Sequence, residues 1–271
     1  MSGISDHPLP SYETPPVGEV VFGTLFEPLD QMLAPHLGVL WNQFPADFAS
    51  CEEQPPLPPI VEAACTTPPT ILKSNRFPLP RVWLVHRDGQ RLIQVQRDRF
   101  LFNWRRTKPE DSYPRFDTLF PEFVSHWGIF RRFLADKGLG QLVPRQYEIS
   151  YINHIVAGDG WAEFEDLASV FPDFTWRRTG RFLPAPTSVN LQAVFPLPDN
   201  MGRLHMSIRD ARTLADGKPV FMFEVTVKGV PADDSAATFD TWFRTARGWI
   251  VRGFTDLTSE NMQSQVWRRT Q

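Results

Sequence analysis

Hydrophobic and polar residues alternate with a period of two in several segments, a pattern that is typical of half-buried β-strands. Asp88-Gly89 and Asp216-Gly217 lie between such segments and favour tight turns that join antiparallel strands. The pattern predicts strands over residues 17–26, 81–87, 91–106, 146–155, 188–195, 203–210 and 219–229. These strands would supply the sheets of the protein.

Apolar residues at helical spacing mark two long segments, and each predicts an amphipathic helix. The first stripe runs from Leu119 to Leu134, and Gly138 follows it at a position that favours the end of a helix. The second stripe runs from Phe239 to Leu257. The predicted helices cover residues 29–44 (with a break or a first turn at Pro35), 119–134, 163–170 and 238–257.

Together these elements predict an α+β fold, in which antiparallel sheets from two related halves are each backed by a long amphipathic helix. Both helices carry a Phe-Asp-Thr-x-Phe sequence, at residues 116–120 and 239–243, which indicates an internal duplication. Chance similarity between two amphipathic helices is the alternative. The predicted organisation is a flexible N-terminus (1–16), a first half (17–155) with a proline-rich loop (45–80), a connector (156–186) and a second half (187–271), all within one compact unit.

Charge is distributed unevenly along the chain, although the formal net charge is only −3. Nine acidic residues and no lysine or arginine precede Lys73. Two interpretations remain open. Either the acidic segment lies against the basic remainder of the protein, or that basic remainder binds an anion or nucleic acid.

The sequence lacks the motifs of common catalytic and metal sites. Cys51 and Cys65 do not have zinc-ligand spacing, the six histidines form no close-spaced pair, and no nucleotide-binding or hydrolase motif occurs. The N-terminus does not resemble a signal peptide, and no apolar run reaches the roughly 18 residues of a membrane span. We therefore expect a cytoplasmic protein without cofactor, metal or membrane contact. An enzyme with an unrecognised site remains an alternative.

The segment 91–106 contains the most informative polar residues. If it is one continuous strand, Gln94 and Gln96 share a face with the large aromatic residues Phe102 and Trp104. Buried amides cost stability unless they are hydrogen-bonded, so we expect an organised polar cluster in or beside the core. Its predicted members are Gln94, Gln96, Asn103, Trp104, Arg105, Tyr151 and Asn153. This cluster either lines a small-molecule pocket or forms a satisfied network within the core.

The same region is rich in arginine, which suggests a second kind of site. Arg97, Arg99, Arg105 and Arg106 are the candidates for a basic sheet surface that binds nucleic acid or a nucleotide phosphate. The alternative is that these residues pair with the acidic N-terminal segment.

Several sequence runs resemble a sporadically distributed bacterial family of uncharacterised proteins. The resemblance covers nearly the whole chain and is carried by residues 19–23 (EVVFG), 94–105 (QVQRDRFLFNWR), Tyr113, Phe116, 151–154 (YINH), 249–254 (WIVRGF), 257–258 and Trp267. It implies no activity, cofactor or substrate. The family commonly has a His-Glu pair before the Trp-Ile segment, where this chain has Arg247-Gly248, so a role for that histidine does not carry over.

These observations favour a non-catalytic binding or interaction protein. The sporadic distribution of the similar family suggests a sensor or adaptor in a bacterial defence or stress gene cluster. The partner stays unknown at this point: a protein partner or a homo-oligomer fits such a module, and nucleic acid fits the arginine-rich alternative.

Overall fold

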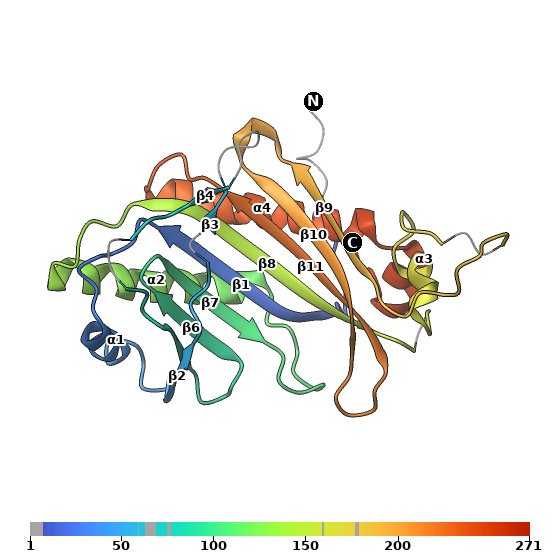
Figure 1. The fold of residues 1–271 in the computed structure, drawn as a ribbon, viewed down its shortest axis with the longest axis horizontal. Coiled ribbons are helices and arrows are strands. Elements are labelled where there is room, and N and C mark those ends of the chain that lie inside the picture. Colours follow the sequence, from blue (N-terminus) through green and yellow to red (C-terminus); the bar gives the residue numbers. More distant parts are fainter. Residues whose placement is uncertain (1–7, 59, 63–68, 75–76, 159, 177–178) are drawn as a thin grey trace.

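A single antiparallel sheet organises the part of the chain that the structure describes, residues 8–58, 60–62, 69–74, 77–158, 160–176 and 179–271 of a computed structural model. Its nine strands, of 5 to 13 residues, form a twisted sheet (Figure 1). In spatial order they are β2 (Ser50–Gln54), β5 (Arg81–Val85), β6 (Arg91–Gln96), β7 (Arg99–Arg105), β1 (Val17–Phe26), β8 (Pro144–Val156), β11 (Pro219–Gly229), β10 (Arg203–Arg212) and β9 (Asn190–Pro196).

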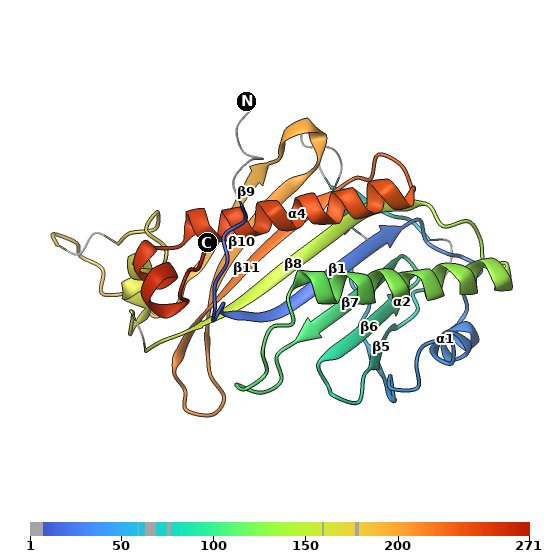
Figure 2. The ribbon, with the colours of Figure 1, turned by 180° about the vertical axis from the view of Figure 1, so that it is seen from behind.

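Two long helices, α2 (Phe116–Lys137) and α4 (Ala236–Leu257), lie side by side across one face of this sheet (Figure 2). We call this the helix face. The helix α2 ends at Gly138, which has a φ of 61°, as the sequence indicates. The N-terminus of α4 is capped by the Ser235 side chain, which accepts a hydrogen bond from the Thr238 backbone.

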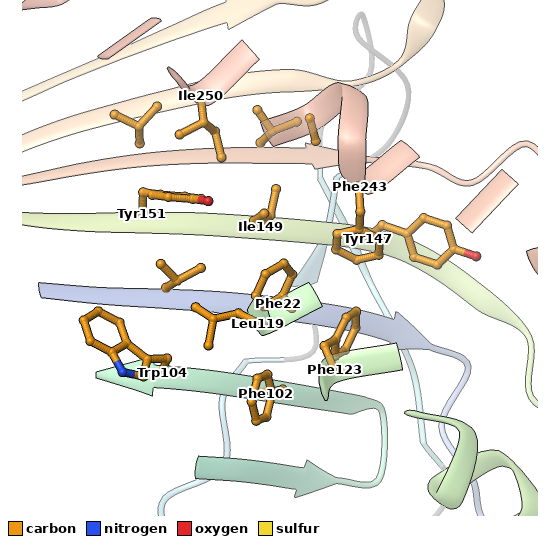
Figure 3. Close-up of a cluster of buried hydrophobic side chains, with 14 of the residues drawn as sticks. Phe22, Phe102, Trp104, Leu119, Phe123, Tyr147, Ile149, Tyr151, Phe243 and Ile250 are labelled. Atoms are coloured by element: carbon orange, nitrogen blue, oxygen red, sulfur yellow. The ribbon is translucent and has the colours of Figure 1, made fainter. Parts of the chain in front are cut away.

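The core between the helices and the sheet is dominated by aromatic side chains (Figure 3). Phe22 of β1 is fully buried at its centre. Its ring centroid lies 5.3 Å from that of Phe123 in α2 and 6.1 Å from that of Phe243 in α4. Aromatic pairs at these separations add stabilisation beyond the area they bury, so β1 and both helices form one packed unit.

The prediction of an α+β fold with antiparallel strands is therefore confirmed. The structure differs in one respect, since the strands form one continuous sheet instead of separate ones. Strands β1 and β8 join the two parts of the sheet through a register that runs from Val17 opposite Asn153 to Phe26 opposite Pro144.

The prediction of one strand over residues 91–106 is wrong. The segment is a hairpin, in which Arg97 and Asp98 turn between β6 and β7 and Gln96 pairs with Arg99. A two-residue turn reverses the face on which later residues point, relative to a continuous strand. Thus Gln94 lies opposite Leu101, whereas Phe102 lies opposite Ile93 on the helix face.

The proline-rich loop crosses the other face of the sheet (Figure 1). We call its described residues 55–58, 60–62, 69–74 and 77–80 the strap, and the surface beneath them the strap face. The strap contains a small hairpin of β3 (Ile60–Val61) and β4 (Thr70–Ile71). A proline-rich segment is stiff and extended, which suits a long crossing with few strand pairings of its own.

The remaining elements are short. They are α1 (Ala34–Trp41), η1 (Phe164–Asp166), α3 (Leu167–Val170), η2 (Pro198–Asn200) and a π-helical turn, η3 (Met262–Val266). The helix predicted over residues 29–44 begins later because Pro35 occupies its first turn. Residues 1–7 of the predicted flexible N-terminus lie outside the described residues. Cys65 of the proline-rich loop lies outside them too. Tyr12 forms a bridge with Arg269 near the other end of the chain.

Candidate ligand-binding site

The seven residues of the predicted polar cluster lie on two opposite faces of the sheet. The hairpin turn at Arg97-Asp98 causes this division, because it separates the amides of β6 from the aromatic residues of β7. Gln94, Gln96, Asn103 and Arg105 lie on the strap face, whereas Trp104, Tyr151 and Asn153 lie on the helix face.

On the strap face, hydrogen bonds connect four adjacent strands. The Oε1 atom of Gln94 accepts from Arg81 (2.8 Å) and from the Trp83 indole (3.0 Å). Its Nε2 atom donates to Asn103 Oδ1 (2.8 Å), and Asn103 Nδ2 donates to Glu19 Oε1 (2.6 Å). Burial raises the pKa of Glu19, and the Asn103 hydrogen bond opposes that shift. Apart from Arg81 Nε, which has no hydrogen-bond partner, these polar groups satisfy one another, so this part of the cluster is an internal network.

Further side chains of the strap face hold the strap. Gln96 exchanges two hydrogen bonds with the backbone of Leu57, at 2.8 and 3.0 Å. Gln146 accepts from the backbone nitrogen of Glu62 (2.7 Å). The Glu62 carboxylate lies 2.6 Å from Nε2 of His205 in β10. The strap thus shields the polar face from strand β6 to strand β10.

The arginines of the nucleic-acid alternative do not form a common exposed surface. Arg97 and Arg99 are each only 6% exposed. Their guanidinium groups donate to the backbone carbonyls of Phe77 and Pro58, both at 2.6 Å. Arg105 is half-buried and donates to the carbonyl of Gly89 (2.9 Å), and Arg106 is half-buried too. The geometry therefore favours a structural role for at least Arg97 and Arg99.

A cavity of about 530 Å³ opens on the helix face, beside the start of α2 and the middle of α4. We call it the inter-helix cavity. Tyr151 and Asn153 of β8 form its floor, and the N-terminal segment 9–17 forms part of its wall. The other lining residues are Tyr113, Arg115 and Asp117 near the start of α2, Arg247, Ile250, Val251 and Phe254 of α4, and Gln271.

The floor of the cavity carries polar groups within an otherwise apolar core. Tyr151 and Asn153 are 6% and 2% exposed, and Ile250 of α4 lies beside Tyr151 (Figure 3). The hydroxyl groups of Tyr113 and Tyr151 are 2.9 Å apart, and the nearby Arg247 guanidinium acts to lower the pKa of Tyr151 against the effect of burial. Burial raises the pKa of both tyrosines, so both hydroxyls stay protonated and can donate at neutral pH. Asn153 donates to the carbonyl of Phe223 (3.0 Å).

The rim of the cavity contains a strained residue. Arg115 precedes α2 with φ 73° and ψ 159°, a backbone conformation that is almost confined to glycine. Its guanidinium donates to the carbonyl of Tyr12 at 2.8 Å and thereby holds the N-terminal segment against the cavity. Strained residues of this kind cluster at functional sites, where the surrounding structure maintains them.

The sequence predicted part of this site and missed the rest. Tyr151 and Asn153 line the cavity, and the ring of Trp104 lies 5.6 Å from that of Tyr113. Arg115 carries no sequence signal of a ligand site, and Arg247 stands out only as the position where the similar family commonly has a histidine. The two residues come from distant segments that only the fold brings together. Only the family resemblance indicates Tyr113.

Neither a protein-family model nor a curated protein matches the sequence. Among the described residues, no three His, Cys, Asp or Glu side chains are grouped so that they could hold a metal ion. Of the helices in the described ranges, none has the length and apolar character that a bilayer crossing requires. The chemistry of the site therefore has to be inferred from the cavity itself.

Proposed function

We propose that the protein is a binding module that holds a small molecule in the inter-helix cavity. The observation that carries the proposal is the pair of buried polar side chains, Tyr151 and Asn153, on the floor of a cavity of about 530 Å³. Ligand pockets in proteins have this size and combine apolar walls with a few convergent polar groups.

We further propose that the module arose by internal duplication. In each half a long strand is followed, after an intervening segment, by a three-stranded meander and then by a long helix: β1, β5–β7 and α2 in the first, β8, β9–β11 and α4 in the second. The first half has one more strand, β2, which pairs with β5 at the edge of the sheet. In both halves the last strand of the meander pairs with the long strand that begins that half: β7 pairs with β1, and β11 pairs with β8. Asp240 follows Asp117 by 123 positions within the shared Phe-Asp-Thr-x-Phe sequence.

The duplication relates the inter-helix cavity to a smaller cleft of about 300 Å³. One aspartate of α2 and four residues of α4 line the inter-helix cavity. In the smaller cleft the helices are exchanged, so that the equivalent aspartate comes from α4 and the four equivalent residues come from α2. The same spacing of 123 positions pairs the lining residues of the two clefts. The pairs are Asp117 with Asp240, Arg247 with Val124, Ile250 with Trp127, Val251 with Gly128, and Phe254 with Arg131.

The comparison of the two clefts supports the proposed function. Arg247 lines the cavity, whereas the equivalent position in the smaller cleft is Val124. The two-helix architecture therefore does not itself require an arginine there. Arg131 of the smaller cleft corresponds to Phe254 of the cavity, so each cleft has its arginine at a different position. The shared architecture therefore does not dictate the polar lining of the cavity, which supports a role beyond packing.

The wider biological role rests on association alone. The resemblance to a sporadically distributed bacterial family supports a non-catalytic sensor or adaptor in a defence or stress gene cluster. Such a protein would couple ligand occupancy of the cavity to an interaction with a partner. The cytoplasmic location and membership in that family belong to this same proposal.

Thermal unfolding in the presence of a panel of metabolites and nucleotides tests the binding function. A ligand that binds only the folded state raises Tm. We expect at least one compound to do so, and to lose its effect in Tyr151→Phe and Asn153→Leu. Tyr147→Phe is the matched control, because Tyr147 lines the smaller cleft. No shift with any compound, together with an Asn153→Leu variant as stable as the original, would show that the cavity is only a packing defect.

A further inference from the structure

The charge of Arg247 has no carboxylate counterpart within the described chain. Its side chain is half-buried, and its guanidinium carbon lies 5.2 Å from the centroid of the Phe116 ring. Of the described acidic residues, none forms an ion pair with it. Asp117, which also lines the cavity, is exposed and lies 4.0 Å from Arg244 instead. A partly desolvated guanidinium without a counter-ion is costly, and a bound anion would offset that cost.

A second guanidinium adds to the positive potential at the same cavity. Arg115 on the rim lies with its guanidinium carbon 5.6 Å from the Tyr113 ring. The hydroxyl groups of Tyr113 and Tyr151 supply an O–H donor that remains after their mutual hydrogen bond. Arginine and tyrosine donors together match the oxygens of a carboxylate or a phosphate.

Part of the cavity wall is apolar. Ile250 and Phe254 of α4 are buried there, and Val17 at the start of β1 faces the same space. Such a wall accommodates a hydrocarbon or aromatic group and would not stabilise a second charge. The cavity therefore combines charged and polar groups with apolar side chains.

We propose that the ligand of the inter-helix cavity is a small organic anion. Its carboxylate or phosphate would contact Arg247 and the Tyr113–Tyr151 hydroxyl pair, and its apolar body would pack on Ile250 and Phe254. This inference rests on the proposed function, since it names the class of molecule that the same cavity takes. The smaller cleft has Val124 in place of Arg247, and its own Arg131 is accompanied by the carboxylates of Asp234 and Asp240, so it would not bind such an anion.

Calorimetric titration of the full chain with matched probes tests this inference. The probes are 3-phenylpropanoate, phenyl phosphate and the neutral 3-phenylpropanamide. We expect one or both anions to bind and the amide to bind at least about tenfold more weakly, because it cannot form the charge-assisted hydrogen bonds. Comparison of the two anions distinguishes a carboxylate site from a phosphate site. This comparison needs only the unmodified protein.

Two variants localise the binding. Arg247→Gln should weaken the anion by about tenfold or more, whereas Arg131→Gln in the smaller cleft should leave its affinity unchanged. Three results would each overturn the inference. They are equal binding of the acid and the amide, unchanged affinity of the Arg247→Gln variant for the anion, and no binding of either anion at millimolar concentration. A neutral ligand found in the wider panel would then leave the proposed binding function intact. Failure of that entire panel would remove the binding function as well.

Discussion

Asn103 of β7 donates a hydrogen bond of 2.6 Å to the carboxylate of Glu19 in β1. Asn103 is 3% exposed, and Glu19 is half-buried. The bond is the last of a chain of hydrogen bonds that begins at Arg81 and Trp83 in β5, next to the edge strand β2, and passes through Gln94. The amides of the central hairpin thus connect its strands to the middle of the sheet.

We expect Asn103→Leu to destabilise the protein by about 1–3 kcal/mol at neutral pH, because it leaves the Glu19 carboxylate and the Gln94 amide without a partner. Burial already raises the pKa of Glu19, and the loss of its donor would raise it further. When the pKa of a carboxyl is higher in the folded state than in the unfolded state, the free energy of unfolding falls as the pH rises through the folded-state pKa. The defect should therefore be smaller in mildly acidic buffer.

Denaturant unfolding of Asn103→Leu, Glu19→Gln and the double variant checks this coupling. We expect the double variant to be more stable than the sum of the two single effects indicates. Additive effects and a pH-independent defect would show that Asn103 and Glu19 do not interact as the geometry indicates.

His126 of α2 is expected to make folding stability depend on pH. Its ring lies among Phe44, Phe48 and Phe102, its Nδ1 atom has no hydrogen-bond partner, and burial lowers its pKa from 6.5 to about 4. Between these two values the unfolded chain binds a proton that the folded chain does not. Stability should therefore fall as the pH drops from about 6.5 to about 4, by about 3 kcal/mol in total.

The variant His126→Leu should lack this part of the pH dependence. Free energies of unfolding measured at several pH values, for the original protein and the variant, give the comparison. Parallel curves through the interval would mean that His126 is protonated equally in the folded and unfolded states.

Two substitutions of Arg115 should separate backbone strain from side-chain contact. Both Arg115→Gly and Arg115→Ala remove the hydrogen bond to Tyr12, but only glycine adopts a φ of 73° with a ψ of 159° without a steric penalty. We expect the glycine variant to be more stable than the alanine variant by about 1 kcal/mol. Thermal unfolding of the pair measures this, and an alanine variant of equal or greater stability would contradict the strain.

The contact between Glu62 and His205 should hold the strap on the sheet. Desolvation of Glu62 acts to raise its pKa, but the close contact with His205 and the nearby positive charges of Lys228 and Arg203 outweigh it and lower the pKa. A carboxyl with a lowered pKa stabilises the folded state above its ordinary pKa and loses that contribution as the pH falls. We expect Glu62→Gln to expose the strap to limited proteolysis at neutral pH. Cleavage at the same rate as in the original protein would show that the remaining strap contacts suffice.

Much of the fold was accessible from the sequence, because long strands and helices with regular hydrophobic periods identify themselves. The predicted strand over residues 17–26 has the bounds of β1, and the predicted long helices agree with α2 and α4 to within a few residues. The sequence does not predict the hairpin at Arg97-Asp98, because its turn contains no glycine or asparagine. Neither Arg97 nor Asp98 has a positive φ. Such a turn carries little sequence signal.

The candidate site was only partly predictable for a different reason. Tyr151 and Asn153 share a face of one strand, which alternation alone reveals. Arg115 and Arg247 reach the same cavity from the start of α2 and the middle of α4. Their proximity depends on the order of strands in the sheet and on the packing of two helices, which no local pattern encodes.

A crystal structure with a bound ligand from the compound panel tests the central claim most directly. We expect electron density for the ligand in the inter-helix cavity, in contact with Tyr151 and Asn153. Density for the ligand elsewhere on the protein, with the inter-helix cavity unchanged, would contradict the account.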